Sequence, residues 1–566
     1  MKIIIDKKEY LAEEGQTVLD VCRKNGIEIP ALCYHPDLGI KANCRLCLVE
    51  VVGQKKLQTS CSTKVFEGME VITNSVNIRR ARKINLELVV SSHIEKCATC
   101  IWDQNCSLQK LAREYGVFIN RFSDRKKDRP TEFFGPAIEF DQSKCIDCGL
   151  CVEMCQKQQC NVFEVKGKGS ETTVTAERVK DCSYCGQCVV HCPVGALQGK
   201  GEWQEVEKAL NDKNKILIAQ CAPSIRASIG EEFNLPYGQV VTGQMVAALK
   251  KLGFDKVFDI NLGADFTSFE EAKELKERLE AKKLPMFTSC CPAWVRFVEV
   301  FYPEFIPNLT TANSPQMCSG PIIKTYYADK IGKKPSDIVT VSIMPCTSKK
   351  YEAKRDEFKF DDGTPYIDHV ITTREFAYLL RRKGIELCDL APEEPDNPLG
   401  KYSGAGAIYG ASGGVMESAL RTAVEWISGK KPESLEFTKV RGQEGIKRAE
   451  VLVGDKTLKV AVANGLGNAK LILEELKKNP KTYDYVEIMA CPGGCIGGGG
   501  QPVPVSPEIR KKRADSLYNI DKEMKIRTCH ENPSLIRVYD EMLDKKPELI
   551  EKLLHTSYLK KKTTKE

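Results

Sequence analysis

The stretch Glu487-Ile-Met-Ala-Cys-Pro-Gly-Gly-Cys-Ile-Gly-Gly-Gly-Gly-Gln-Pro502 places Cys491 and Cys495 in a loop that is rich in glycine. Glycine lets the backbone approach a bulky group closely and adopt positive φ angles. This loop therefore suits backbone wrapped around an inorganic group, although a flexible loop with two buried thiols has the same pattern. Two more loops bring cysteines next to proline where strands are expected to end: Thr288-Ser-Cys-Cys-Pro-Ala-Trp294 and Met344-Pro-Cys-Thr-Ser-Lys-Lys350.

Together the three loops resemble the catalytic domain of the iron-only (FeFe) hydrogenases. The resemblance covers nearly the whole chain, because the N-terminal cysteine groups are similar to the electron-relay modules of that family. It implies an oxidoreductase that exchanges protons and electrons reversibly with dihydrogen. The implied cofactor is the H-cluster, a 4Fe–4S cluster joined to a two-iron subcluster with CO, cyanide and azadithiolate. Side chains cannot do this chemistry, so the protein supplies position, electrostatics and a proton path.

The composition indicates a multidomain globular protein. A chain of 566 residues is too long for one hydrophobic core, and its 42% hydrophobic and 28% charged content is ordinary. No apolar run approaches ~18 residues and the N-terminus lacks a secretory signal, so we expect a cytoplasmic protein without a membrane span. The 26 cysteines should then serve mainly as metal ligands. The net charge of +7 is spread out, which argues against nucleic-acid binding and leaves a weak preference for an acidic redox partner.

Residues 1–78 are predicted to form a β-grasp domain with one 2Fe–2S cluster. A strand is expected at residues 3–5 and a helix at residues 17–25, with Cys22 as a core thiol. The spacing C-x10-C-x2-C-x13-C differs from the plant ferredoxin loop. It resembles the first domain of hydrogenases and of the large iron–sulfur subunit of respiratory complex I. Zinc is the competing interpretation of the C-x2-C pair. The predicted ligands are Cys33, Cys44, Cys47 and Cys61.

Residues 79–121 carry the pattern His93-x3-Cys97-x2-Cys100-x5-Cys106. One imidazole and three thiolates this close could hold tetrahedral zinc. Beside other cluster motifs, the pattern resembles the histidine-ligated 4Fe–4S module of hydrogenases and complex I. Imidazole is neutral, so it would leave the cluster with one negative charge less than four thiolates and shift its reduction potential.

Residues 136–203 contain the run C-x2-C-x2-C-x3-C twice, the second time followed by Pro193. This is the pattern of bacterial ferredoxins with two 4Fe–4S clusters, in which the fourth cysteine of each run ligates the other cluster. Gln156 stands where proline usually follows the first run, which affects the turn more than the ligation. One cluster would use Cys145, Cys148, Cys151 and Cys192, and the other Cys182, Cys185, Cys188 and Cys155.

Residues 212–566 are predicted to form a two-lobed α/β domain that holds the H-cluster. Strands are expected at residues 216–219, 257–260, 285–289 and 338–343, and helices at residues 245–251, 269–282, 294–301 and 314–331. Such alternation indicates parallel sheets, whose ligands sit beyond the carboxyl ends of the strands. Cys290, Cys291 and Cys346 come directly after two of these strands, as a catalytic site in this architecture requires.

The resemblance assigns the residues around the cofactor. Cys495 would also bridge to the two-iron subcluster, and Lys349 matches the lysine that faces one cyanide. Without that context, Lys349 would be interpreted as a surface lysine, and Met344 and Met489 as core residues. The H-cluster ligands would be Cys291, Cys346, Cys491 and Cys495, and the lining positions Pro223, Ser224, Gln316, Met344 and Met489.

Proton delivery needs titratable or hydroxyl groups in a chain from solvent to the cofactor. Two adjacent cysteines cannot easily both ligate one cluster corner, so Cys290 keeps a thiol and is the expected last member. Glu271 and Glu274 lie three residues apart on one helix face, with Arg278 one turn further. By resemblance these groups form a relay with Thr310, which stands where the family has serine. Glu271 could equally be a solvated helix charge.

The electron partner is left open by the sequence. A monomer would exchange electrons with ferredoxin, whereas a subunit of a larger complex would take them from flavin-bearing, NADH-oxidising partners, including by bifurcation. Maturation proteins are implied for the two-iron subcluster. The alternatives of another class are non-catalytic relatives that assemble iron–sulfur proteins, which lack the first two modules, and sensory hydrogenases. Six cysteines have no assigned role and are mostly expected to be buried: Cys22, Cys160, Cys221, Cys318, Cys388 and Cys529.

Overall fold

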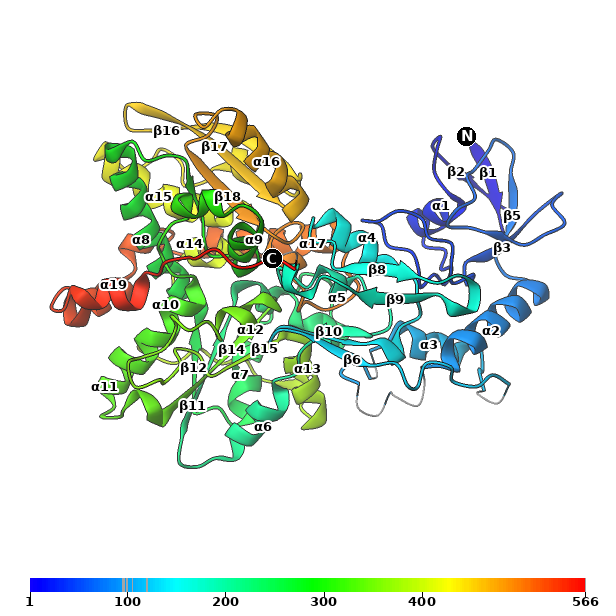
Figure 1. The fold of residues 1–566 in the computed structure, drawn as a ribbon, viewed down its shortest axis with the longest axis horizontal. Coiled ribbons are helices and arrows are strands. Elements are labelled where there is room, and N and C mark those ends of the chain that lie inside the picture. Colours follow the sequence, from blue (N-terminus) through cyan, green and yellow to red (C-terminus); the bar gives the residue numbers. More distant parts are fainter. Residues whose placement is uncertain (94–96, 98–99, 104, 119–120, 565–566) are drawn as a thin grey trace.

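The computed structural model of the chain describes residues 1–93, 97, 100–103, 105–118 and 121–564. Several of the gaps fall in the predicted module 79–121, so part of that prediction lies outside the described residues. The N-terminal modules occupy one end of the longest axis, and the sheets of the C-terminal half occupy the other (Figure 1). The strands of the ferredoxin-like module lie between the two ends.

The first module is a five-stranded mixed sheet packed on a helix. Its strands are β1 (Lys2–Ile5), β2 (Lys8–Leu11), β3 (Leu48–Val51), β4 (Gln58–Thr59) and β5 (Glu70–Ile72), in the spatial order β2-β1-β5-β3-β4. Helix α1 (Val18–Lys24) begins at a capping box, in which the side chains of Thr17 and Asp20 each accept from the other's backbone N–H. Cys22 is a buried thiol of α1, as predicted.

The next two modules follow along the chain. Helices α2 (Val76–Val90) and α3 (Ser107–Glu114) belong to the second module. The third contains a sheet of β6 (Thr131–Phe134), β7 (Ile138–Asp141) and β10 (Leu197–Gly199), and a hairpin of β8 (Phe163–Lys166) and β9 (Thr173–Ala176). Its helices α4 (Leu150–Lys157) and α5 (Gln187–Val190) each start after a glycine with positive φ, Gly149 and Gly186. The two cysteine runs therefore fold alike.

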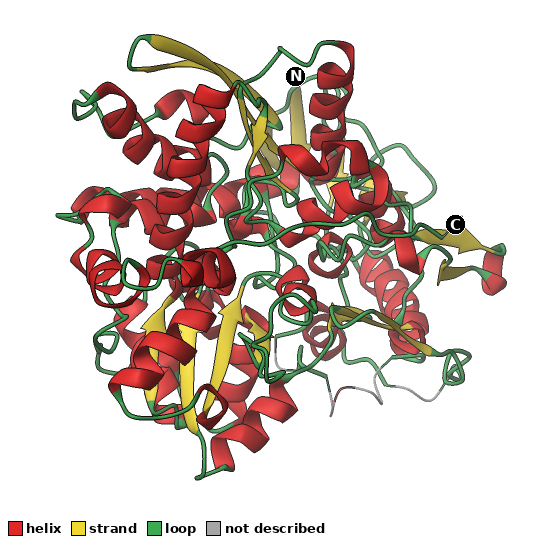
Figure 2. Cartoon of the chain, turned by 60° about the vertical axis from the view of Figure 1, so that its left-hand side comes forward, coloured by secondary structure: helices red, strands yellow, loops and turns green. Residues whose placement is uncertain are grey.

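The C-terminal half contains two four-stranded sheets. The first is parallel throughout, in the order β12 (Lys256–Asp259), β11 (Ile216–Cys221), β14 (Ile338–Met344) and β15 (His369–Thr372). The second has the order β13 (Met286–Phe287), β18 (Tyr485–Met489), β17 (Lys456–Asn464) and β16 (Ile446–Val453), and only β16 runs antiparallel to its neighbour. Figure 2 shows helices packed around the first sheet.

Helices make up most of the rest of this half. Those nearest the site are α8 (Ile260–Ala281), α9 (Pro292–Phe301), α10 (Pro315–Ile322), α12 (Ser348–Glu352) and α15 (Gly414–Ser428). The others are α6 (Trp203–Asn211), α7 (Thr242–Leu252), α11 (Ala328–Lys330), α13 (Thr373–Arg382), α14 (Gly404–Ala407), α16 (Leu466–Lys478), α17 (Pro507–Glu523), α18 (Pro533–Val538) and α19 (Glu548–Leu554). Among the described residues, none of the helices has the length and apolarity needed to cross a membrane.

Two helices differ from the prediction. Helix α8 starts nine residues earlier than expected, because Asp259 caps its N-terminus and the polar residues of its first turns are buried rather than exposed. Burial of polar groups hides the helical period of hydrophobicity on which the prediction relied. The helix predicted at residues 314–331 is interrupted by a π-helical turn (Ile323–Tyr327) shortly after Pro321, since proline has no N–H for the regular ladder.

Candidate functional site

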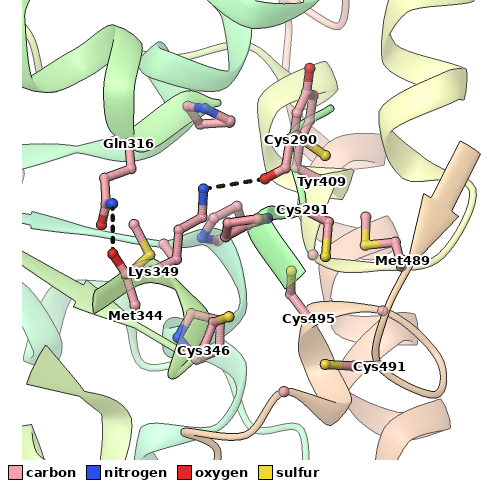
Figure 3. Close-up of a pocket in the computed structure, with 18 of the residues that line it drawn as sticks. Cys290, Cys291, Gln316, Met344, Cys346, Lys349, Tyr409, Met489, Cys491 and Cys495 are labelled. Atoms are coloured by element: carbon pink, nitrogen blue, oxygen red, sulfur yellow. Dashed lines mark hydrogen bonds between the residues drawn. The ribbon is translucent and has the colours of Figure 1, made fainter. Parts of the chain in front are cut away.

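Three loops from the two sheets enclose one cavity. Cys290 and Cys291 lie beyond the carboxyl end of β13, Cys346 beyond β14 and Cys491 beyond β18. Because β14 belongs to the first sheet and the other two strands to the second, the cavity lies between the two sheets. All four cysteines and Cys495 line it (Figure 3).

The donor set of this cavity fits an iron–sulfur cluster. The four predicted ligand thiols line the same cavity. Burial and the neighbouring Cys291 together raise the pKa of Cys346 to about 12. Burial also raises the pKa of Cys491, and the neighbouring Cys346 and Cys291 raise it further. Thiolates this close repel one another unless a metal core lies between them, so the residues present match a thiolate-bound cluster.

Lys349 provides a buried positive charge at the cavity wall. Its Nζ donates to Ser314 Oγ at 2.7 Å, to Glu352 Oε2 at 2.8 Å and to the Cys290 carbonyl oxygen at 3.2 Å. Burial alone would lower the pKa of Lys349, but the Glu352 carboxylate raises it above its ordinary value. The ammonium group therefore stays charged, and three contacts fix its position, of which Figure 3 shows the one to Cys290.

Of the five remaining residues that were predicted to line the cavity, four line it and one lies behind its wall. Four of them face the cavity: Pro223, Gln316, Met344 and Met489. Ser224 is buried behind this wall, where its Oγ accepts from Gln501 Nε2 at 3.2 Å. Gln316 Nε2 donates to Glu352 Oε2 at 3.1 Å. Gln316 Oε1 is buried and has no hydrogen-bond partner among the described residues, so it could accept from a group in the cavity.

The outer half of the predicted relay forms a hydrogen-bonded chain. Glu274 Oε2 accepts from Thr310 Oγ1 at 2.6 Å, and Glu274 Oε1 accepts from Arg278 Nε at 2.8 Å. Arg278 Nη2 also donates to the Leu309 carbonyl oxygen at 2.7 Å. Helix α8 places the two charged residues one turn apart, and the arginine holds the segment before Thr310 against the helix. The structure thus brings Thr310, Glu274 and Arg278 together.

The inner half of the relay is buried and less directly connected. Glu271 is fully buried, so it is not the solvated helix charge that was the alternative. Its Oε1 accepts from Tyr485 Oη at 2.9 Å, and burial raises the pKa of Glu271 to about 8. Burial also raises the pKa of Cys290, with Glu271 the next contributor. Among the described residues, no hydrogen bond joins Glu271 to Cys290 or to Thr310, and Glu271 Oε2 has no partner.

Some polar residues near the relay were missed by sequence reasoning. Thr311 Oγ1 donates to Glu274 Oε2 at 3.1 Å and lies 2.9 Å from His555 Nδ1. His555 Nε2 lies 3.3 Å from Glu270 Oε2. Burial alone would lower the pKa of His555, but the hydrogen bond with Glu270 raises it. A branch therefore leads from Glu274 to a titratable histidine, which no local motif could have indicated.

A further group of hydroxyls lies beside Cys290. Tyr409 lines the cavity, and its hydroxyl lies 2.8 Å from Ser268 Oγ on α8. Ser268 Oγ in turn lies 2.5 Å from Ser418 Oγ on α15. Since all three side chains are buried, this chain of hydroxyls fixes the tyrosine ring beside Cys290 (Figure 3).

The four cysteines of the first module lie in two pairs. The backbone N–H of Cys44 donates to Cys33 Sγ at 3.3 Å, and Cys47 Sγ lies 3.3 Å from Cys61 Sγ. Two pairs of thiols suit a 2Fe–2S cluster, in which each iron takes two thiolates.

The second module contacts the third through its histidine. His93 is buried and its Nδ1 lies 2.9 Å from the Lys144 carbonyl oxygen. When Nδ1 carries the proton and donates to this oxygen, Nε2 has the lone pair that a metal needs. Lys144 precedes Cys145, so the contact joins the histidine to the first ferredoxin-like cysteine run. Cys100 is buried, and Cys97 and Cys106 are half-buried.

In the third module, cysteines of the two runs lie close to one another. Burial raises the pKa of Cys148 to about 12, and Cys192, from the other run, is the next contributor. Burial likewise raises the pKa of Cys155 to about 12, and Cys185, from the other run, raises it further. Each fourth cysteine therefore lies near the other run.

The unassigned cysteines are mostly structural thiols. Cys388 is exposed, which differs from the general expectation of burial. It follows Leu387 in a short turn where only the leucine side chain faces the core. The five buried ones are Cys22, Cys160, Cys221, Cys318 and Cys529.

Family models match almost the whole chain. The iron-only hydrogenase large subunit, C-terminal domain, matches residues 215–499, and the iron hydrogenase small subunit matches residues 507–561. In the N-terminal half, a 2Fe-2S iron-sulfur cluster binding domain matches residues 1–76. The NADH-ubiquinone oxidoreductase-G iron-sulfur binding region matches residues 82–121, and a 4Fe-4S dicluster domain matches residues 144–196.

Relatives of known name agree with the family models. The NADP-reducing hydrogenase subunit HndD of Solidesulfovibrio fructosivorans is 42% identical, over 99% of both chains. Iron hydrogenase 1 of Clostridium pasteurianum is 41% identical, over 99% of this chain and 100% of its own. An apo form of the [FeFe]-hydrogenase HydA1 from Chlamydomonas reinhardtii superposes with a TM-score of 0.57 at 40% identity, over 63% of this chain and 98% of its own. The chain therefore belongs to the iron-only (FeFe) hydrogenases, as a large subunit with N-terminal iron–sulfur domains.

Proposed function

We propose that this oxidoreductase reversibly reduces protons to dihydrogen at an H-cluster ligated by Cys291, Cys346, Cys491 and Cys495. The observation that carries the proposal is the single cavity that gathers these thiols with Cys290 and Lys349. When bound, the H-cluster supplies the metal-centred redox chemistry of dihydrogen, which side chains cannot provide. The protein's own residues hold the cofactor, set the charge around it and move protons.

The cavity wall has separate polar and apolar parts in this proposal. Lys349 keeps its charge through Glu352 and would donate to an anionic ligand of the cofactor. Gln316 offers a second polar group to the cavity, and its Nε2 donates to the same Glu352 carboxylate. Met344 and Met489 exclude water with apolar, polarisable side chains. Pro223 contributes an apolar surface, and Ser224 supports the wall from behind through Gln501.

Protons travel from Arg278 and Glu274 through Thr310 and Glu271 to Cys290. The Thr310 hydroxyl suits an intermediate place, because rotation lets it accept a proton on one side and donate on the other. Glu271, with its raised pKa, holds a proton at neutral pH and releases it without a large free-energy cost. An ordered water or a rotamer change completes the steps on either side of Glu271.

Electrons reach the cavity through four accessory clusters in this scheme, one 2Fe–2S and three 4Fe–4S. Cys33 packs against Cys148 in one hydrophobic cluster, and His93 contacts the residue before Cys145. Both N-terminal modules therefore meet the same ferredoxin-like run. At the other end of that module, Cys491 Sγ lies 3.8 Å from the Cys185 carbonyl oxygen. The second ferredoxin-like cluster is the last accessory cluster before the H-cluster.

The physiological electron partner is proposed to be ferredoxin. A second candidate is a flavin-bearing, NAD(P)-linked partner subunit, and the similarity to the NADP-reducing hydrogenase subunit HndD favours it. The matched small-subunit region at residues 507–561 is part of this chain and does not decide between them. Maturation proteins that load the two-iron subcluster are further partners, and the proposed compartment is the cytoplasm.

The test is dihydrogen output from anaerobically matured protein. Reduced ferredoxin alone is compared with NADH plus flavin-bearing partner subunits, while infrared bands of CO and cyanide report whether the two-iron unit is loaded. Output with ferredoxin alone supports a self-sufficient hydrogenase, and output only with the partners supports a complex. A loaded protein without output under either condition contradicts the proposed function and indicates a sensor. A known hydrogenase is matured in parallel as a control. If only the control acquires the CO and cyanide bands, the result indicates a relative of the non-catalytic, iron–sulfur assembly type.

A further inference from the structure

We propose that Arg374 is the buried counter-charge of two accessory 4Fe–4S clusters and that it raises their reduction potentials. The two clusters are the histidine-ligated one, which Cys100 would ligate, and the ferredoxin-like one that would take Cys192. Arg374 belongs to helix α13 and is 3% exposed. The inference rests on the proposed accessory clusters. It adds to the electron path a residue that lies outside every ligand motif.

Most buried arginines of this chain pair with a carboxylate. Those that do are Arg226, Arg355, Arg421, Arg510 and Arg513. In the described part of the chain, three buried arginines form no ion pair: Arg82, Arg296 and Arg374. A buried charge without a counter-charge is costly. Another source of negative charge is therefore expected beside each of these three.

Two of the unpaired arginines contact loops that hold proposed cluster ligands. Arg82 Nη2 donates at 2.7 Å to the carbonyl oxygen of Leu48, the residue after Cys47. Arg296 Nε donates to the Cys182 carbonyl oxygen at 2.7 Å. A cluster held by thiolates has a net negative charge, which influences its reduction potential. In these two places the clusters would supply the charge that no carboxylate provides.

Arg374 lies close to the ligands of two different clusters. Its Cζ is 5.1 Å from the centroid of the Trp102 ring, and Trp102 follows Cys100 by two residues. A Cβ built on Gly195, three residues after Cys192, would lie 3.1 Å from the same ring. The tryptophan therefore contacts both the guanidinium and the loop of the second cluster. This cation–π contact fixes the arginine at the boundary between the two modules.

The carboxylates near Arg374 are already paired with other cations. Burial lowers the pKa of Arg374, and the carboxylates of Glu232 and Glu375 oppose this effect. Glu232 forms an ion pair with Arg381 at 3.0 Å. Glu375 forms one with Lys350, also at 3.0 Å. Neither carboxylate is therefore left as the counter-charge of Arg374 alone.

The guanidinium also keeps two donors for a further partner. Arg374 Nη2 donates to the Gly499 carbonyl oxygen at 3.0 Å, whereas Nε and Nη1 are buried without a hydrogen-bond partner among the described residues. The next negative groups that act on this arginine are the thiols of Cys192 and Cys100. Reduction adds a negative charge to a cluster, so a fixed cation nearby favours the reduced state.

The experiment measures cluster potentials rather than turnover. The full-length protein is produced without maturation proteins and titrated with redox mediators, while EPR records the reduced clusters. Arg374→Gln removes the charge and keeps an amide donor for the Gly499 carbonyl. We expect the equilibrium constant for reduction of both 4Fe–4S clusters to fall about tenfold, a shift of about 59 mV for a one-electron couple. Arg374→Lys keeps the charge and should stay close to the wild-type potentials.

Two controls separate this effect from a general one. The 2Fe–2S cluster is an internal control, because its predicted ligands are not among the groups that act most on Arg374. The matched variant is Arg382→Gln, the same substitution at the exposed end of α13. Arg382 lies 3.5 Å from Glu207 and its charge is screened by solvent. Neither control potential should move.

Several results would overturn the proposal. These are unchanged 4Fe–4S potentials in Arg374→Gln with intact iron content, an equal fall in Arg374→Lys or Arg382→Gln, an equal fall for the 2Fe–2S cluster, and a shift confined to one 4Fe–4S cluster. If Arg374→Gln does not take up its clusters, the uncharged Arg374→Met makes the same comparison. Loss of iron in every Arg374 variant would show a structural role instead. A wild-type protein without accessory 4Fe–4S signals would count against the proposed function itself.

Discussion

Thr310 Oγ1 donates to Glu274 Oε2 at 2.6 Å, and this contact joins the loop after α9 to helix α8. The same carboxylate oxygen accepts from the backbone N–H of Thr311 at 2.8 Å. The hydroxyl therefore stands where the exposed part of the relay meets its buried part.

Replacing Thr310 with valine keeps the shape of the side chain and removes the hydroxyl. We expect viologen-driven dihydrogen output to fall about tenfold to a hundredfold, because a positioned proton carrier contributes on the order of 10²-fold or more. Thr310→Ser is the control and should stay near the wild-type rate. Full activity of Thr310→Val with intact infrared bands would remove Thr310 from the relay.

The pKa of Glu271 makes a prediction about stability. Burial raises this pKa from the reference value of 4.5 to about 8. Because the folded pKa is the higher one, the native state binds more protons between these values, and the free energy of unfolding falls as pH rises through this window. Glu271→Gln cannot ionise and should lose that part of the pH dependence. Urea unfolding of the cofactor-free protein at several pH values measures it, and identical slopes for both proteins would contradict the assignment.

Tyr485 provides the companion test in the active enzyme. Its hydroxyl donates to Glu271 at 2.9 Å and lowers the carboxyl pKa relative to burial alone. Tyr485→Phe should therefore raise the pKa of Glu271 and move the alkaline limb of dihydrogen production to higher pH. Tyr409→Phe, which leaves this hydrogen bond in place, is the matched control. A limb that stays where it is in Tyr485→Phe would mean that Glu271 does not set it.

The adjacent cysteines 290 and 291 should respond differently to the same change. Cys290→Ala is expected to keep the iron content and lose most turnover, because the terminal proton carrier is gone. Cys291→Ala is expected to lose the four-iron cluster itself, because one of four thiolate ligands is missing. Iron analysis and dihydrogen output separate the two outcomes. Near-wild-type output from Cys290→Ala would exclude it as the last relay member.

Arg226 should stabilise the loop that carries Pro223. Its Nη2 donates to both carboxylate oxygens of Asp259 at 2.9 Å, and its Nε donates to the Pro223 carbonyl at 3.0 Å. Both charged groups are buried, so Arg226→Ala leaves a buried carboxylate unpaired and should cost about 3–5 kcal/mol of unfolding free energy. Denaturation of the cofactor-free protein measures this cost. Arg226→Ala/Asp259→Ala, which removes both charges, should recover part of it.

The family and the modules could be predicted because cluster ligation is local in sequence. Runs such as residues 145–155 and 182–192 contain the spacing that a cluster needs, whatever the rest of the chain does. The ion pair between Lys349 and Glu352 could also have been predicted from the sequence, because Glu352 lies three residues further on the same helix. Three strands of the parallel sheet, β11, β12 and β14, lie close to where apolar runs predicted them, whereas β15 was not predicted.

The rest depended on contacts between distant parts of the chain. Tyr485 and Glu271 are separated by 214 residues, and Thr311 and His555 by 244. No spacing rule connects such pairs, so only the folded structure brings them together. The early start of α8 was hidden for a related reason. Its first turns bury Asn261 and Asp265, polar residues that are satisfied or enclosed only by the surrounding elements.

The loop of Cys185 and the glycine loop after Cys495 touch backbone to backbone. A Cβ built on Gly499 would lie 2.6 Å from Gly186 Cα, and Gln187 Nε2 donates to the Gly497 carbonyl at 2.9 Å. Electron tunnelling falls steeply with distance, so the absence of side chains here keeps donor and acceptor centres at short range. A single methyl group at Gly499 would act as a spacer between them. In the proposed electron path, these glycines would therefore keep the last accessory cluster close to the H-cluster.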